Sequence, residues 1–185
     1  MSINLSKVSK KARGYEYVLL VMRHAKAEPF GDGGDESRSI TDKGSKQAKT
    51  VAKGLIEMRL TPDRIACSSA MRARQTLDRM LKAFGDDPKV DYRQALYSDG
   101  MQAVFDELAT TSNKIHTLMI LGHEPTVSIS CQWLASSDSD AHRLDLLNLG
   151  LSTASVVVFG SNQPFSQWQV HSAELLAVIN PKDFD

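Results

Sequence analysis

The sequence predicts an α/β protein: a three-layer α/β/α sandwich around a mostly parallel central sheet. Short, continuous runs of apolar residues are typical of strands that are buried on both faces, as in parallel sheets. Between these runs lie longer segments in which apolar residues recur three and four positions apart, as on one face of a helix. Strands that alternate with such helices indicate parallel pairing, because a parallel pair needs a long crossover connection. The length of 185 residues fits one domain, or two at most.

The strands are predicted from apolar runs bounded by polar residues. The most apolar run is 17–22 (YVLLVM), and the run 116–121 (HTLMIL) ends at Gly122. The segments 155–159 and 168–170 are separated by a short loop, which predicts a hairpin-like unit. In chain order, we expect strands at residues 17–22, 64–67, 89–92, 116–121, 155–159, 168–170 and, at the sheet edge, 175–179.

The helices are predicted from apolar spacing and from end signals. We expect them at residues 48–58, 70–84, 101–109 and 125–135. Pro62 is expected to stop the first helix and Gly85 to cap the second. Pro125 suits the first turn of the fourth helix. Residues 29–39 contain three glycines and several acidic residues, and they predict a flexible loop.

Composition excludes several classes of protein. Lysine plus arginine and aspartate plus glutamate both total 22, and the resulting zero net charge argues against a generic nucleic-acid-binding surface. Cys67 and Cys131 cannot form the disulfide framework of a small secreted domain, and no Cys-x-x-Cys pair offers a thiolate zinc site. The longest strongly apolar run, 18–22, is far shorter than the roughly 20 residues that cross a bilayer. We therefore expect neither a nucleic acid nor a membrane as partner.

The N-terminal segment is basic. Residues 1–16 carry four lysines and arginines, and no apolar stretch typical of a signal peptide follows them. We expect a cytoplasmic protein in which residues 1–16 form a short flexible arm and residues 17–185 form a single domain.

Two histidines and two arginines follow predicted strands. Arg23 and His24 come directly after the first strand, and His123 comes after the strand that ends at Leu121. Arg72 lies at the start of the helix that follows the second strand. These side chains should meet, because ligands of open α/β sheets bind beyond the carboxyl ends of the strands. Arginine forks suit phosphate oxygens, and histidine can take and release a phosphoryl group, so the sequence predicts a phosphate site.

The residues around these four positions form three ordered motifs. The motifs are residues 21–28 (VMRHAKAE), 68–76 (SSAMRARQT) and 121–123 (LGH). In order and spacing they resemble the signature of the histidine phosphatase superfamily, which has the phosphoglycerate-mutase-like fold. Arg38 before residues 40–44 (ITDKG), together with residues 95–97 (ALY), resembles the small SixA-like phosphohistidine phosphatases in particular. The resemblance runs from about residue 17 to the C-terminus.

The resemblance implies a phosphatase that needs no metal and no cofactor. His24 would attack phosphorus and become phosphohistidine, which water would then hydrolyse to release inorganic phosphate. Arg23, Arg72 and His123 would hold the phosphoryl oxygens. Arg38 is either a further phosphate or substrate contact or an ordinary loop arginine.

One residue of the family pattern is missing. Many members of the superfamily carry a glutamate after the third strand region as the general acid for an alcohol leaving group. Residues 95–101 (ALYSDGM) contain no glutamate; Asp99 is the nearest carboxylate, and Glu28 is a second candidate. An alkoxide needs a proton to leave, whereas imidazole, with a pKa near 6.5, leaves with little help. The predicted substrate is therefore phosphohistidine in a protein.

Two alternatives stay open. The first is a phosphatase for a small phosphate ester, with Asp99 or Glu28 as the acid. The second is a non-catalytic module that binds phosphate or a phosphoprotein on the same fold. The presence of both His24 and His123 counts against the second, because binding alone needs no nucleophile.

Overall fold

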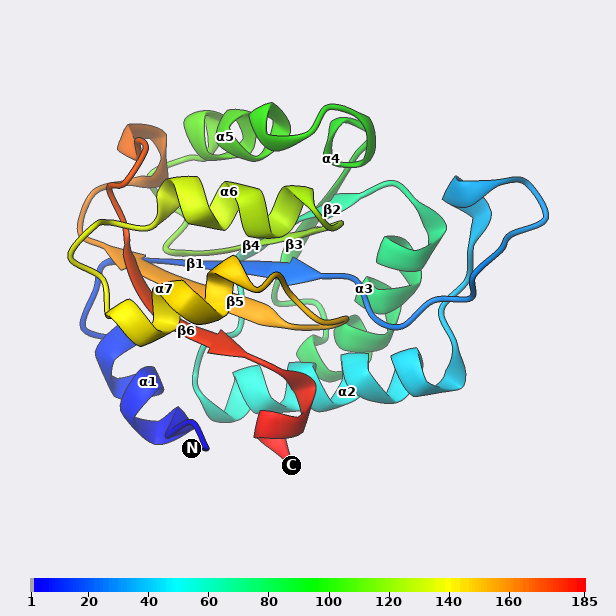
Figure 1. The fold of residues 1–185 in the computed structure, drawn as a ribbon, viewed down its shortest axis with the longest axis horizontal. Helices are drawn as coiled ribbons and strands as arrows, with labels where there is room; N and C mark the ends of the chain where they lie inside the picture. Colours follow the sequence, from blue (N-terminus) through cyan, green and yellow to red (C-terminus); the bar gives the residue numbers. More distant parts are fainter. Residues whose placement is uncertain (1) are drawn as a thin grey trace.

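The computed structural model describes residues 2–185, and its centre is a six-stranded sheet. The strands are β1 (Tyr17–Arg23), β2 (Arg64–Ser68), β3 (Lys89–Arg93), β4 (Thr117–Gly122), β5 (Val156–Ser161) and β6 (Glu174–Ile179). Their order across the sheet is β3-β2-β4-β1-β5-β6 (Figure 1). β3, β2, β4 and β1 are parallel to one another, β5 is antiparallel to β1, and β6 is antiparallel to β5. The predicted α/β class with a mostly parallel sheet is confirmed.

Helices cover both faces of the sheet. They are α1 (Leu5–Ala12), α2 (Asp42–Glu57), α3 (Met71–Phe84), α4 (Ala95–Ser98), α5 (Met101–Thr110), α6 (Thr126–Leu134) and α7 (Ala141–Asn148). The described residues also form short 3₁₀ helices: η1 (Asp35–Ser37), η2 (Phe165–Gln167) and η3 (Pro181–Phe184). One core cluster joins the sheet to α1, α2 and α3, and a second joins it to α4, α5, α6 and α7 (Figure 1). The three layers are those that the sequence predicts.

The central strand β1 shows why its sequence is continuously apolar. Val18, Leu20 and Met22 belong to the cluster under α1–α3. Leu19 and Val21 belong to the cluster on the opposite face. Because side chains alternate along a strand, a strand covered on both faces needs apolar residues at every position. The same burial fixes the register that carries Arg23 and His24 to the carboxyl edge of the sheet.

The end of α2 differs from the sequence prediction. The helix ends at Glu57, well before Pro62. Arg59 has a left-handed backbone with φ of 57°, and the Leu60 N–H donates to the Leu55 carbonyl at 2.9 Å. This turn satisfies a carbonyl at the helix end, so a left-handed residue rather than the proline stops the helix.

The segment 168–170 is not the strand that the sequence predicts. The turn η2 precedes it, and Trp168 packs on Phe165 with ring centroids 5.1 Å apart. The indole N–H donates to the Gln163 carbonyl at 2.8 Å, and the Gln169 N–H donates to the Ser172 hydroxyl. These local bonds replace a strand ladder, and β5 pairs with β6 instead.

The basic N-terminal segment also differs from the expected flexible arm. Asn4 caps α1 by accepting the Lys7 N–H at 2.9 Å. Val8 and Ala12, one helical turn apart, are buried in the core, and the Ser9 hydroxyl donates to the Met58 carbonyl at 2.7 Å. Ile3 and Leu5 pack partly buried against the same core, so one apolar face of this lysine-rich segment docks on the domain.

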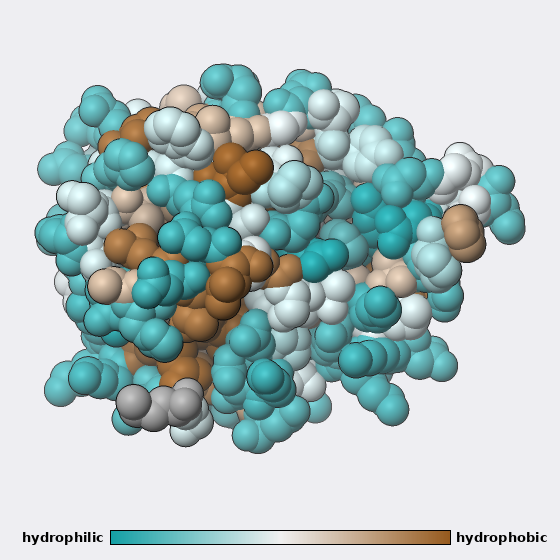
Figure 2. All heavy atoms as spheres, in the orientation of Figure 1, coloured by the Kyte–Doolittle hydropathy of each residue, from teal (hydrophilic) through white to brown (hydrophobic). Residues whose placement is uncertain are grey.

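Two short helices, α4 and α7, were not predicted. α4 has four residues, and in α7 only Leu147 is fully buried, with Leu144 packed partly buried against the same core. Both apolar faces are too short to be recognised from periodicity. Figure 2 shows an apolar patch over α7 on an otherwise largely polar face. Leu146 and, just after the helix, Leu149 are exposed. Within residues 2–185, none of the helices has the length and apolar character of a membrane span.

Candidate active site

The predicted site residues meet at the carboxyl edge of β1, β2 and β4. His24 follows β1 and His123 follows β4, and their ring centroids lie 5.3 Å apart. Arg72, in the first turn of α3, donates from Nε to His24 Nε2 at 3.3 Å. All three side chains are buried. The sequence-based expectation that these residues converge agrees with this geometry.

The backbone around His24 is held by three elements. The His24 N–H donates to the Gly122 carbonyl of β4, and the His24 carbonyl accepts the Ala154 N–H, each at 3.0 Å. The next N–H, of Ala25, donates to Thr76 Oγ1 at 3.0 Å. Thr76 lies one helical turn after Arg72 on α3, and it is a supporting residue that the sequence analysis missed. It ties the segment after β1 to the helix that carries Arg72.

The hydrogen bonds of His24 fix its tautomer. Nδ1 lies 2.7 Å from the Ala25 carbonyl, which can only accept, so Nδ1 carries the proton. Nε2 is then an unprotonated nitrogen that accepts from Arg72. Burial, above all, and then the charges of Arg72 and Arg23 together lower the pKa of His24 from 6.5 to about 4. At neutral pH the ring is a neutral base whose free lone pair is on Nε2, as a nucleophile requires.

His123 is held by the hydroxyl group of Ser68. Its Nε2 lies 2.7 Å from Ser68 Oγ, and the Ala70 N–H donates to the same hydroxyl oxygen at 3.2 Å. Burial, followed by the charge of Arg72, lowers the pKa of His123 to about 3, so the ring is neutral. If the Ser68 hydroxyl donates to Nε2, the proton of His123 resides on Nδ1, which is buried and has no partner in residues 2–185. A buried N–H without a partner is costly, and an anion beside the two histidines would satisfy it.

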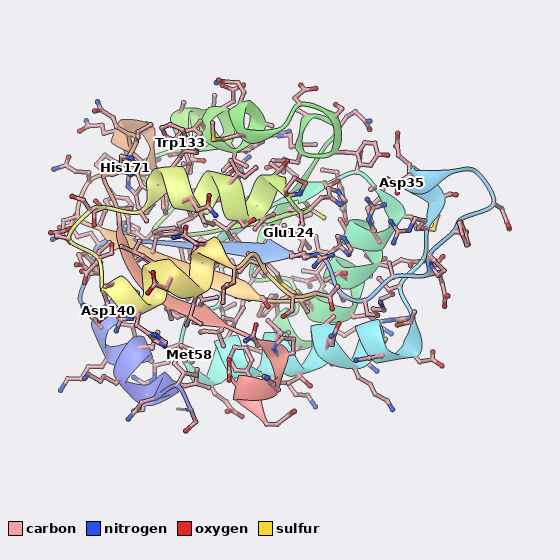
Figure 3. All side chains as sticks on the ribbon, in the orientation of Figure 1. Asp35, Met58, Glu124, Trp133, Asp140 and His171 are labelled. Atoms are coloured by element: carbon pink, nitrogen blue, oxygen red, sulfur yellow. The ribbon has the colours of Figure 1, made fainter. Side chains whose placement is uncertain are left out.

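Arg23 offers a second buried N–H without a partner. Its Nη1 donates to the Leu151 carbonyl at 2.7 Å, whereas its Nε has no partner among the described residues. Burial lowers the pKa of Arg23, and the nearby carboxylate of Glu124 opposes that shift. Glu124 accepts the Ser128 hydroxyl at 2.7 Å and the Leu151 N–H at 3.2 Å (labelled in Figure 3). Glu124 therefore holds the loop that positions Arg23.

Asp35 is a site residue that the sequence analysis did not single out. Arg72 donates from Nη1 to the Asp35 carbonyl at 2.9 Å and from Nη2 to its Oδ2 at 3.1 Å. The Tyr97 hydroxyl donates to Oδ2 at 2.8 Å, and Arg38 Nη1 donates to Oδ1 at 3.1 Å. The Tyr97 hydrogen bond, with those of the arginines, lowers the pKa of Asp35 to about 2. Figure 3 places Asp35 where the loop 29–39 approaches α3.

The three remaining candidates differ in position. Arg38 joins the site through Asp35 and also donates from Nε to the Glu28 carbonyl at 2.7 Å. Asp99 is exposed and accepts the Ser98 hydroxyl. Glu28 is exposed, and its contacts are made by its backbone. Within residues 2–185, no hydrogen bond or ion pair joins the carboxylate of Asp99 or Glu28 to the site.

The depressed histidine pKa values predict how the site responds to acid. His24 and His123 are neutral in the folded chain, whereas an unfolded histidine titrates near 6.5. Unfolding therefore takes up protons below that value, and the free energy of unfolding should decrease as the pH falls from about 6.5 towards about 4. Side-chain ¹⁵N spectra, assigned with His24→Ala, should show His24 neutral down to about pH 5. A His24 midpoint near 6.5 would contradict this description.

Comparisons with known proteins agree with the geometry. The model of the histidine phosphatase superfamily (branch 1) matches residues 19–97. An uncharacterized protein of Mycobacterium tuberculosis is 34% identical over 140 residues, which are 74% of this chain and 85% of the relative. An uncharacterized protein of Mycobacterium leprae is 28% identical over 166 residues, or 87% of this chain and 100% of the relative.

Solved structures with the same fold include several described as SixA. The putative phosphohistidine phosphatase SixA from Nakamurella multipartitia has a TM-score of 0.75 and 28% identity, and the alignment covers 89% of this chain and 96% of that one. The protein histidine phosphatase SixA complexed with tungstate has a TM-score of 0.74, with coverage of 91% and 99%; at 16% identity this likeness concerns the fold alone. Together with the family match and the mycobacterial relatives, these findings establish that the chain belongs to the histidine phosphatase superfamily.

Proposed function

We propose that this protein is a metal-independent phosphatase that removes phosphate from phosphohistidine in a protein, through a phosphohistidine intermediate on His24. The observation that carries the proposal is the state of His24. Its Nδ1 is bound to the Ala25 carbonyl, and its Nε2 is a buried, unprotonated nitrogen beside Arg72. A site that served only for binding would not need a free nucleophile at this point.

In the first step, the lone pair of His24 Nε2 forms a bond to phosphorus, and the bond from phosphorus to the leaving group breaks. The Arg72 Nε–H, which donates to Nε2 in the free protein, can then donate to a phosphoryl oxygen. The unpartnered Arg23 Nε–H and His123 Nδ1 offer two further contacts. Donors fixed before the reaction stabilise the charge on the equatorial oxygens of the transition state, where most catalysis of phosphoryl transfer arises.

In the second step, water releases phosphate from His24. Because Nδ1 keeps its proton, phosphorylation of Nε2 makes the ring a cation, which the Ala25 carbonyl stabilises through the existing hydrogen bond. Attack of water on phosphorus returns the bonding electron pair to Nε2, so His24 leaves as a neutral imidazole. One water proton is lost to solvent, and inorganic phosphate departs.

The carboxylates near the site favour a nitrogen leaving group. Asp35 has a pKa of about 2 and is ionised at neutral pH, so it cannot protonate an alkoxide. Asp99 and Glu28 are exposed, as described above. An imidazole leaves without such a proton donor, which supports phosphohistidine over a serine or sugar phosphate. A series of substrates with different leaving groups tests this preference directly.

We expect kcat/KM to fall steeply as the pKa of the leaving group rises. A phosphohistidine peptide and p-nitrophenyl phosphate should be turned over much faster than a phosphoserine peptide. Asp99→Asn and Glu28→Gln should change these rates by less than about threefold, because a general acid typically contributes about 10²–10⁴-fold. A shallow series, with a loss of about 10²-fold in either variant on phosphoserine alone, would instead favour a small-ester phosphatase. If the protein turned over none of these substrates, the remaining interpretation would be a non-catalytic module that binds phosphate or a phosphoprotein.

A further inference from the structure

Asp35 is a carboxylate in direct contact with the phosphate-binding machinery. Three side-chain donors reach it: Arg38 on Oδ1, and Arg72 and Tyr97 on Oδ2. Its electrostatic influence extends to His123, whose pKa it raises slightly against the larger effects of burial. Neither of the two proposed phosphoryl-transfer steps uses this carboxylate.

The position of Asp35 is on the side from which a leaving group departs. In an in-line transfer, the leaving group lies opposite the attacking nitrogen. His24 is at the buried end of the site, 6% exposed, whereas the Asp35 side chain is 51% exposed. The leaving group must therefore point to solvent, past the loop that carries Asp35. Tyr97 stands on the same side, edge-on to His123 with ring centroids 5.5 Å apart.

The loop is anchored so that Asp35 stays at this place. The Glu28 N–H donates to the Ser39 carbonyl at 2.8 Å, which closes the base of the loop. The Ile40 N–H donates to the Gln75 side chain of α3, also at 2.8 Å. With Arg72 bound to the Asp35 carbonyl as well, the backbone of the loop is tied directly to the helix that binds phosphate.

Asp35 keeps capacity for one more donor. A carboxylate offers about four acceptor positions, and three are filled by side chains. The free position is on Oδ1, which accepts from Arg38 alone. Because the group is ionised, it can accept a hydrogen bond from a leaving group and cannot donate one.

We propose that Asp35 accepts the N–H of the leaving imidazole and is the residue that makes this site prefer phosphohistidine to phosphate esters. The inference rests on the proposed function. In the substrate, one ring nitrogen carries phosphorus and the other carries a proton taken from water. As the P–N bond breaks, its electron pair returns to the first nitrogen, and the ring leaves as neutral imidazole with the proton still on the second. Asp35 stabilises that protonated ring by a charge-assisted hydrogen bond, whereas an alkoxide offers no N–H and is repelled.

The test measures kcat/KM of Asp35→Asn and Glu36→Gln on two substrates, a phosphohistidine peptide and p-nitrophenyl phosphate. Asp35→Asn keeps the size and one oxygen of the side chain but removes its charge. Glu36→Gln is the matched control, since Glu36 is exposed in the same turn η1. We expect Asp35→Asn to lower kcat/KM on a phosphohistidine peptide roughly tenfold or more, the value of a charge-assisted hydrogen bond. On p-nitrophenyl phosphate the loss should be several-fold smaller, because any part of the effect that acts through Arg72 is common to both substrates. Glu36→Gln should leave both substrates within about twofold of wild type.

The outcomes separate this inference from the proposed function. Equal losses on both substrates would show that Asp35 only orients Arg72, which overturns the inference and leaves the function intact. A wild-type protein that hydrolyses p-nitrophenyl phosphate but not the phosphohistidine peptide would overturn both.

A second measurement needs no variant. N-phosphorylimidazole can carry an N–H, whereas its N′-methyl derivative cannot. Relative to spontaneous hydrolysis, the wild-type protein should accelerate the first compound roughly tenfold more than the second. Equal acceleration would contradict the role of Asp35, even if Asp35→Asn fails to fold.

Discussion

Replacing His24 by alanine should abolish turnover, with kcat reduced by at least about 10⁴-fold on every substrate. The variant keeps the backbone bonds of residue 24 to Gly122 and Ala154, so the fold should persist. It loses the nitrogen that forms the bond to phosphorus. Rapid quenching with a labelled phosphohistidine peptide should trap phosphate on the wild-type protein and none on His24→Ala.

The matched control for this prediction is His142→Ala. His142 lies on the exposed surface of α7, outside the site, and its variant should keep wild-type rates. Added imidazole should partly restore turnover to His24→Ala, because it can enter the space of the missing ring and attack phosphorus in its place. A folded His24→Ala protein with turnover within about tenfold of wild type would refute the covalent mechanism.

The sequence indicates the fold and the centre of the site because both depend on local patterns. A strand buried on two faces must be apolar throughout, as β1 is up to Met22. Polar side chains directly after such a strand are candidates for function, because burying a polar group without a hydrogen-bond partner costs free energy. His24 and His123 follow strands that pair in the parallel register, so their convergence follows from the topology. Arg72 is recognisable because it lies in the first turn of the helix after β2.

Asp35 could not be predicted in the same way. It lies in a glycine-rich loop without apolar periodicity, and its contact with Arg72 depends on the path of that loop. The loop path is fixed by distant bonds, such as that from the Ile40 N–H to Gln75. The signal that was available is the pairing of an acid with Arg38 three residues later, which matches the observed ion pair of 3.1 Å.

Other differences also reflect tertiary contacts. The backbone of Arg59 turns left-handed although arginine has no preference for that conformation, and α2 ends there. Trp168 packs on Phe165 and donates a hydrogen bond to the Gln163 carbonyl, both close in sequence. These local contacts outweigh the β-propensity of a Trp-Gln-Val segment. Thr76 shows the converse: its spacing one turn after Arg72 is readable in the sequence, but its partner, the Ala25 N–H, is distant in the chain.

Replacing Arg72 by alanine should have the largest effect on turnover after His24→Ala. We expect kcat to fall about 10²–10³-fold, which corresponds to about 2.7–4 kcal/mol of transition-state stabilisation. The buried guanidinium donates to His24 and binds Asp35 in the free protein, so it is oriented before substrate arrives. Arg72→Lys should recover only part of the loss, because an ammonium group keeps the charge but lacks the planar fork. The measurement is kcat and KM separately, since loss of a contact made mainly in the transition state lowers kcat more than it raises KM.

Arg74→Ala is the matched control for Arg72→Ala on the same helix. Arg74 is exposed, and its guanidinium lies over the ring of Tyr92, 4.5 Å from the centroid, so it takes no part in the site. Its removal should leave kcat within about twofold of wild type. If Arg72→Ala and Arg74→Ala had equal effects, Arg72 would act through the charge of α3 as a whole. A much larger loss in Arg72→Ala, with Arg72→Lys between the two, would place the guanidinium on the phosphoryl oxygens, because geometry and not charge alone would then set the rate.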